Sequence, residues 1–497
     1  MWAWWNDKTF VDLAPAQIQS YYNPLLDLPF FALIQSNLST VAVCFFLGFP
    51  FGLGVYFLVR ITKIAAEDLK SRVPLIVLVS AVVLATTGAA GRSQIGSTMN
   101  EWSTSALVLA ALFVLLRSAS SHGSVTAKAA SSSALLLGAA TGLKLTASVF
   151  AVATFVALAV WVVIRRCRVR ELILFSCAGV VGFLATYAFW GVRLWAHFRN
   201  PFFPYFNGLF RSPFWEPVNF VDARFFPKSA LEWIILPVRL ARTNQLTAEL
   251  PMRDPRFFVL ATIGFFVLAD DLRRRLAHDK PSTISLSNAP AIAFLSVFVA
   301  VSYVAWLKTF SIYRYTIPIE SIGSVLIAIG LWRLLKRVGL GTWAFAFCSL
   351  VIFLRTRPPD WGRLRAHRGP FLQVTAPTLP RGSMVLILNH EPVGYVVPFF
   401  GTDPVVVRPI SNFTRPSMTN ELQQQMRASV RAQAGPIFEL QVSGVTHEDR
   451  QSALAQYELV QDGGSCAVIR SNLESETLRL CRLVRAPAIH PGPGGAE

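Results

Sequence analysis

Long blocks without any charged residue constrain the fold of this chain more than any other feature. Residues 28–59, 73–91, 145–164, 172–192 and 281–307 contain no Asp, Glu, Lys or Arg. A helix needs about 20 residues to cross the hydrocarbon core of a bilayer, so most of these blocks are long enough. Shorter charge-free blocks can span when the helix tilts or when flanking side chains snorkel. They lie at 102–116, 129–143, 257–269, 321–332 and 338–354.

Ten such blocks in series predict an α-helical polytopic membrane protein with about ten transmembrane helices. Charged residues make up only 15% of the 497, against roughly 25% in soluble domains, which agrees with this fold class. The expected crossings lie near 39–60, 73–91, 102–117, 130–142, 146–164, 172–192, 256–270, 288–307, 317–335 and 339–355.

The basic residues are placed as a membrane topology requires. They gather in alternate connections, one of which holds Arg165, Arg166, Arg168 and Arg170. The positive-inside rule assigns these connections to the cytoplasm. It places the others outside: 1–38, 91–101, 142–146, 193–256, 308–316 and 356–497. The net charge of +18 therefore follows from topology. With no basic, aromatic-rich soluble surface, we expect no nucleic-acid partner.

Residues 1–38 are predicted to form an exported loop, although no hydrophobic segment precedes them. Two arrangements account for this. Either the first helix inserts with its N-terminus outside, or an upstream crossing segment is missing from the sequence. We favour the second arrangement, which makes 1–38 a truncated first loop.

The composition changes after Arg357, and 357–483 are predicted to form a small exported α/β domain behind the transmembrane domain of 39–356. Short strand patterns and amphipathic helical patterns alternate there. The strands are expected at 383–389, 404–409, 436–442 and 465–470, and the helices at 419–432 and 449–456. The Pro/Gly-rich tail 484–497 is predicted to be disordered. Within the exported loop 193–255, residues 229–242 are expected to form an interfacial helix.

The cysteines are consistent with this layout. Cys44, Cys177 and Cys348 lie in apolar segments, where cysteine is usually a small packed hydrophobe. Cys167 lies in a basic cytoplasmic turn. Cys466 and Cys481 lie together in the exported region, on runs that resemble neighbouring strands, so a disulfide is possible there. No spacing of Cys and His resembles a metal site.

Several phrases stand in an order that resembles a known family. They are NPLLDLPF (23–30), GSTMNEWSTSALVLAALFVLL (96–116), GLKLT (142–146), NPFFPYFN (200–207) and YRYTIP (313–318). Their order and the matching topology resemble bacterial membrane glycosyltransferases of the GT-C fold, which include polyprenyl-phosphate-dependent mannosyl- and arabinosyltransferases. The resemblance covers roughly residues 5–335.

The resemblance implies a GT-C-like enzyme in the bacterial inner membrane. Its donor would be a polyprenyl-phosphate sugar, and its acceptor a glycan, lipid or protein on the exported side. Members of the superfamily typically carry an essential Asp or Glu in the first exported loop. Because that loop is incomplete here, the principal acid of the family is expected upstream of Met1.

Three acids are candidates for the carboxylate that takes the proton of an acceptor hydroxyl. Glu101 lies at the exported start of a crossing helix. The helix dipole also favours an acid at that position. Asp12 and Asp27 belong to the first loop, and Asp27 also suits the capping of a turn. A structural and a catalytic role are both open for each of them.

Three cations are candidates for binding the departing phosphate. Lys144 is the only charge between Lys128 and Arg165 and lies at the tip of a helical hairpin. An ionisable group at membrane depth suggests function, although snorkelling also explains it. Arg314 lies between two tyrosines. It either anchors an aromatic belt at the membrane surface or binds phosphate through its planar guanidinium group. Arg92 is the third.

Asn200 and Tyr313 complete the predicted substrate-binding set. Asn200 opens a Pro- and aromatic-rich loop that either walls a sugar or lipid groove or anchors the loop at the interface. A divalent cation, Mg²⁺ or Mn²⁺, is a possible cofactor on the phosphate, but no ligands for it can be identified.

Two other classes of protein share this layout. An O-antigen polymerase or ligase also has a large exported loop, with arginines dominating its site; loss of activity on replacing Arg211 and Arg224, but not Glu101, would favour that class. A transporter usually has inverted repeats and broken helices with midplane charges. No second copy of the GLKLT hairpin is present, which argues against a transporter.

Overall fold

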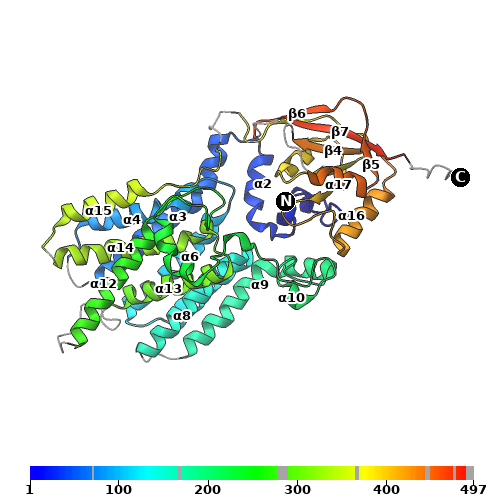
Figure 1. Cartoon of the computed structure of the whole chain (residues 1–497). Helices are drawn as coiled ribbons and strands as arrows, with labels where there is room; N and C mark the ends of the chain where they lie inside the picture. The colour runs from blue at the N-terminus through cyan, green and yellow to red at the C-terminus, as the bar shows by residue number, and fades with distance from the viewer. Residues whose placement is uncertain are drawn as a thin grey trace, which may run out of the picture.

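The computed structural model describes residues 1–69, 72–165, 169–276, 289–337, 339–363, 369–442, 448–473 and 477–487. Figure 1 shows a bundle of helices on one side and a smaller domain built on a β-sheet on the other, with the N-terminus beside the sheet. Cys167 and the tail beyond residue 487 lie outside the described residues, so the expectations for them stay predictions.

Each of the ten expected crossings coincides with a helix. The helices are α3 (Thr40–Glu67), α4 (Leu75–Thr86), α6 (Glu101–His122), α7 (Ala127–Leu143), α8 (Ser148–Arg165), α9 (Arg170–Phe198), α12 (Arg256–Leu276), α13 (Pro290–Thr309), α14 (Ile317–Arg337) and α15 (Thr342–Arg355).

Fewer than ten of these helices are long and apolar enough to cross a membrane. Within the described ranges, 6 candidate spans meet that requirement, and they contain α3, α6, α8, α9, α13 and α14. α4 and α15 are apolar but shorter, with 12 and 14 residues. The described helices are therefore compatible with a membrane protein. About ten spans were expected, and six helices qualify by length and composition.

α14 lies at the centre of the bundle, since 83% of its most apolar window is buried, against 17% for α3 and for α9. The outer helices turn apolar residues such as Phe45 and Phe49 outward, as lipid contact requires. α7 and α9 pack so closely that a Cβ on Gly138 would lie 2.0 Å from the Gly179 carbonyl oxygen. Small residues permit such backbone contact between membrane helices.

The long connection after α9 contains α10 (Asn207–Phe210), the short η4 (Ala223–Phe225) and α11 (Ala230–Leu240). α11 matches the helix expected at 229–242. Leu231 and Ile234 on one of its faces are exposed, whereas Leu236 and Leu240 are fully buried. The helix therefore packs one apolar face on the protein and leaves other apolar side chains exposed, which suits contact with the membrane interface.

The C-terminal domain is a seven-stranded sheet in the order β1-β6-β7-β4-β2-β3, with β5 also paired to β7. β2 runs parallel to β3 and β4, and β7 is antiparallel to its neighbours. The strands are β1 (Val374–Thr375), β2 (Met384–Leu388), β3 (Val405–Ile410), β4 (Ile437–Val442), β5 (Leu459–Gln461), β6 (Ala467–Ser471) and β7 (Leu478–Arg485); the helices are α16 (Glu421–Ala432) and α17 (Glu448–Gln456).

The four strands and two helices expected in this domain are confirmed. β1, β5 and β7 were not predicted. β7 alternates apolar residues with three arginines along LRLCRLVR, and it belongs to the sheet rather than to a disordered tail as far as Arg485. Cys466 and Cys481 form a disulfide, which the sequence left open.

The N-terminal segment, with α1 (Trp2–Trp5) and α2 (Leu28–Gln35), lies against this domain. Leu13 N donates to Val406 O at 2.8 Å, and Arg408 N donates to Leu13 O at 3.0 Å. Asp12 Oδ1 accepts from Val406 N at 2.9 Å. The segment thus covers the open edge of β3, which would otherwise expose unpaired backbone groups.

Candidate functional site

Glu101 and Lys144 form the centre of a charged cluster at one end of the bundle. Glu101 begins α6 and is 5% exposed. Lys144 follows the last residue of α7, at the tip of the hairpin. Its Nζ lies 2.6 Å from Glu101 Oε1 and donates to Met99 O at 3.1 Å. The hairpin tip therefore brings its cation directly onto the first carboxylate of α6.

Arg314 joins the same cluster from η5 (Tyr313–Thr316). Its Nε lies 3.7 Å from Glu101 Oε1, and its Nη1 lies 2.8 Å from Glu249 Oε1. The Tyr315 ring lies 5.5 Å from Lys144 Nζ and 5.0 Å from the Arg314 guanidinium carbon. The structure therefore brings Glu101, Lys144 and Arg314 together at one end of the bundle.

Several buried polar atoms around Arg314 have no hydrogen-bond partner in the described part of the chain. They are Gln94 Oε1, Glu101 Oε2, Thr247 Oγ1, Arg314 Nε and Trp361 Nε1. Gln94 Nε2 donates to Arg314 O at 3.1 Å, and Thr247 O accepts from Tyr313 N at 2.6 Å. Buried polar groups are nearly always paired in native proteins. A group of unpaired donors and acceptors is therefore typical of a site that binds a polar ligand.

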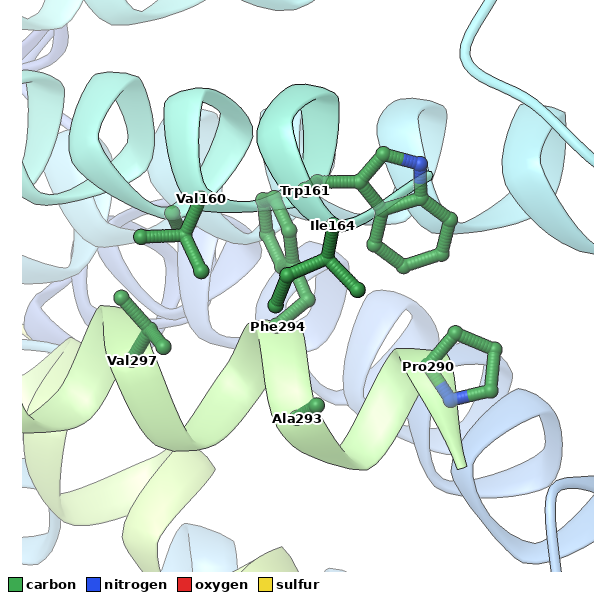
Figure 2. Close-up of a pocket in the computed structure, with 8 residues that line it drawn as sticks. Val160, Trp161, Ile164, Pro290, Ala293, Phe294 and Val297 are labelled. Carbon is green, nitrogen blue, oxygen red and sulfur yellow. The ribbon is translucent and has the colours of Figure 1, made fainter. Parts of the chain in front are cut away.

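A hollow of about 210 Å³, counting space open to solvent, lies beside Arg314. It is lined by Ala90, Ser93, Ala248, Glu249, Leu250, Tyr313, Arg314, Pro359 and Trp361. The wall combines a carboxylate, a guanidinium and an indole. A second hollow, between α8 and α13, is lined only by apolar residues such as Val160, Phe294 and Val297 (Figure 2). Trp161 also lines it, and none of its lining residues has an ionisable side chain.

Two of the other predicted residues lie near the cluster. Asp27 Oδ1 accepts from Asn100 Nδ2 at 2.8 Å, one residue before Glu101. Arg92 is exposed in α5 (Ala89–Ser93), next to the hollow-lining Ser93.

The other three predicted residues make structural contacts, although Tyr313 also lines the hollow. Tyr313 is 1% exposed, and its hydroxyl donates to Glu320 Oε1 at 3.2 Å. Asn200 is fully buried and holds its own loop, with Nδ2 donating to Tyr205 O at 2.9 Å. Asp12 lies at the edge of β3 and not in the charged cluster. Burial raises the pKa of Asp12 to about 6, against the opposing effect of Lys8.

Tyrosines from the two long loops lie close to Arg314. The hydroxyls of Tyr22 and Tyr205 are 2.7 Å apart, and their rings are stacked. Burial raises the pKa of Tyr22 to about 12, while the charge of Arg314 lowers it. The aromatic loop expected at 200–207 thus places at least one hydroxyl beside the cluster.

Sequence reasoning missed Glu249 and a group of buried charges formed by Asp254, Arg256 and Glu320. Arg256 Nη1 lies 2.9 Å from Asp254 Oδ1, and both side chains are at most 2% exposed. Glu320 is also 2% exposed. One signal was available: Glu320 is the only acid in the crossing expected at 317–335, and an isolated carboxylate in a membrane helix suggests function.

No three His, Cys, Asp or Glu residues come together as metal ligands within the described ranges. The divalent cation stays a prediction. Comparison of the chain with family models, with curated proteins and with solved structures finds no match.

Proposed function

We propose that this chain is a membrane glycosyltransferase that moves a sugar from a polyprenyl-phosphate carrier to a glycan, lipid or protein acceptor. The observation that supports it is the contact of Lys144 and Arg314 with the same buried carboxylate, Glu101. A carboxylate beside two cations supplies the two functions that such a transfer needs, a proton acceptor and a phosphate-binding group.

The transfer forms one bond and breaks another. The oxygen of the acceptor hydroxyl attacks the anomeric carbon, and the bond between that carbon and the phosphate oxygen breaks. The electron pair leaves with polyprenyl phosphate, and the hydroxyl proton passes to a carboxylate. Glu101 is our candidate for this carboxylate, because its Oε2 is buried and makes no hydrogen bond in the described chain.

Lys144 and Arg314 retain hydrogen-bonding capacity for the phosphate. An ammonium group has three donors, and Lys144 Nζ uses two of them, on Met99 O and Glu101 Oε1. Arg314 Nε has no hydrogen-bond partner among the described atoms. Charge-assisted hydrogen bonds from both groups would stabilise the leaving phosphate. A Mg²⁺ or Mn²⁺ ion could add to this stabilisation, although no ligands are assigned to it.

The surroundings agree with a lipid carrier and an exported acceptor. The cluster lies where membrane helices meet the two long loops and the linker to the C-terminal domain. The apolar helices offer a surface for the prenyl chain, and the loops offer polar groups for the sugar. We place this end of the bundle on the exported face of a bacterial inner membrane, on the basis of the charge distribution.

Gene deletion with complementation tests the proposal without knowledge of the acceptor. We expect deletion to remove one kind of sugar from an envelope glycan and to raise the level of its polyprenyl-phosphate donor, as measured by mass spectrometry. Wild type should restore the glycan, whereas Glu101→Gln should not, at equal membrane abundance. Glu216→Gln, an exposed loop acid, is the matched control. Unchanged glycans after deletion would refute the proposal, and altered polymer length with the same sugars would favour a polymerase or ligase.

A further inference from the structure

The buried charges of Asp254, Arg256 and Glu320 adjoin the candidate site without lining it. Two carboxyl groups face one guanidinium, and all three side chains are at most 2% exposed. Such groups are expensive to remove from water, and well-packed apolar residues often stabilise a fold equally well or better. A role in stability alone therefore explains this cluster poorly, and its contacts indicate another role.

The two carboxylates hold the start of α5. Asp254 Oδ2 accepts from the backbone N–H of Ala89 at 2.8 Å. Glu320 Oε1 accepts from Ala90 N at 3.1 Å, and Glu320 Oε2 accepts from Gly91 N at 2.9 Å. Three successive backbone groups are thus fixed by side chains from two distant segments. Both Ala90 and Ser93 of this short helix line the hollow beside Arg314.

The same cluster also fixes the segment that carries Arg314. Tyr313 OH donates to Glu320 Oε1 at 3.2 Å, and Tyr313 N donates to Thr247 O at 2.6 Å. Tyr313 therefore connects the cluster to its neighbour Arg314. It also connects Arg314 to the loop segment that contains Thr247 and Glu249.

Arg256 extends the cluster to the linker of the C-terminal domain. Its Nη1 donates to Thr356 Oγ1 at 2.7 Å, and the backbones of Arg253 and Arg357 exchange hydrogen bonds of 2.9 and 2.8 Å. Pro359 and Trp361 of this linker form the remaining wall of the hollow. The cluster thus binds α5 and Tyr313 directly. It reaches the linker through Thr356 and the segment with Glu249 through Tyr313.

We propose that Asp254, Arg256 and Glu320 are positioning residues that hold Arg314 and the walls of the hollow in the geometry that binds substrate. The cluster acts through Tyr313 on Arg314 and through α5 and the linker on the hollow. None of its three side chains contacts the ligand. The inference rests on the proposed function for the identity of that ligand, a polyprenyl phosphate, but not for the positioning itself.

Tyr313→Phe tests the connection to Arg314, because it removes one hydroxyl and keeps the ring. We expect Tyr313→Phe to lower the affinity of the purified full-length protein in nanodiscs for undecaprenyl phosphate about tenfold. When Arg314→Gln is already present, Tyr313→Phe should lower the affinity less than about twofold, because the effects of residues that act through one another are not additive. Ser321→Ala is the matched control. Ser321 is buried in α14, next to Glu320, and its hydroxyl donates to Ala85 O at 2.9 Å, so its loss should leave affinity unchanged. Equal losses from Tyr313→Phe in both backgrounds, or an equal loss from Ser321→Ala, would overturn the inference.

Hydrogen–deuterium exchange tests positioning independently of any ligand. Glu320→Gln places an amide N–H₂ against backbone donors, so exchange should rise in residues 89–94 and 313–316 and stay unchanged in α11. Unchanged exchange in the first two segments would refute positioning. If wild type does not bind undecaprenyl phosphate while the exchange pattern holds, the proposed function fails and the positioning role stands.

Discussion

Lys144 Nζ and Glu101 Oε1 lie 2.6 Å apart, although 43 residues separate them in the chain. The side chain of Glu101 is 6% exposed and that of Lys144 is 23% exposed. Glu101 therefore depends on Lys144 for most of its charge compensation, since Arg314 Nε is farther away at 3.7 Å. Because of this dependence, variants of the two residues can separate the effect of the pair on folding from its effect on transfer.

Lys144→Met should lower the amount of folded protein, because it leaves a buried carboxylate without its nearest cation. Breaking a buried pair on one side costs about 3 kcal/mol or more; the partial exposure of Lys144 reduces this. The double variant Lys144→Met/Glu101→Gln should recover folding, as judged by monodisperse gel filtration, while transfer stays absent. Recovery of transfer in the double variant would contradict a role for Glu101 as proton acceptor.

Arg314→Ala should abolish transfer without lowering membrane abundance, because its side chain is 30% exposed and Lys144 still compensates the charge of Glu101 at 2.6 Å. Arg314→Lys keeps the charge but loses the planar fork that suits phosphate. We expect it to retain partial transfer, with donor affinity reduced about tenfold or more by loss of a charge-assisted hydrogen bond. Donor titrations of both variants in the transfer assay measure this, and equal activity of Ala and wild type would exclude Arg314 from the site.

Arg211→Ala and Arg224→Ala should leave transfer within about twofold of wild type, as is usual for exposed positions. Arg224 is 78% exposed at its side chain and pairs with Asp222 at 2.6 Å; this hydrogen bond lowers the pKa of the Asp222 carboxyl. Arg211 is also exposed. Complemented deletion strains provide the measurement. Loss of function here, with Glu101→Gln still active, would favour an O-antigen polymerase or ligase.

Gly88→Ala should reduce thermal stability by about 1–3 kcal/mol, the usual effect of overpacking. A Cβ at this position would lie 1.9 Å from Glu320 Cδ, so the buried carboxylate would have to move. Gly52→Ala in α3 is the control, because a Cβ there meets no atom within 4 Å. Thermal unfolding in detergent compares the two. A stable Gly88→Ala protein would show that the Glu320 cluster can shift without consequence.

Asp12 should make the protein more stable as pH falls from 7 to 5. Burial raises its pKa from 3.8 to about 6, and Asp403 adds to this while Lys8 opposes it. The folded state thus binds the proton more tightly than the unfolded state, and stability is lost as pH rises through about 6. The gain between pH 7 and 5 is about 1 kcal/mol. The melting temperature of wild type should therefore rise relative to that of Asp12→Asn between pH 7 and 5; no relative rise would contradict this.

Periodicity and charge-free length were sufficient to predict where the helices lie. They were not sufficient to predict which helices span. α4 ends at Thr86 because the chain then turns into α5, whose first N–H groups bind Asp254 and Glu320. That end depends on residues far away in sequence. β7 was not predicted for the same reason, dependence on distant residues. It contains three exposed arginines and forms a strand by pairing with β4 and its other neighbours in the sheet.

The candidate site was predictable where each charge stood alone in an apolar stretch, as Lys144 and Arg314 do. It was not predictable where several charged residues are neighbours in the sequence. Asp254 and Arg256 lie in the polar-looking stretch RDPR, which resembles an ordinary membrane-surface segment, yet both are buried. Asp12 was predicted as a candidate acid of the site but lies outside the cluster, because the sequence does not reveal that its loop pairs with a strand almost 400 residues later.

The pairing of Leu13 with β3 sets an order of events during synthesis. Residue 13 leaves the ribosome early, but its partners at 406 and 408 are made only after every membrane helix. Until then, the segment around Leu13 lacks these backbone partners. Completion of the C-terminal sheet then joins Leu13 to β3, and the helices between them are enclosed in a loop that is closed by hydrogen bonds alone.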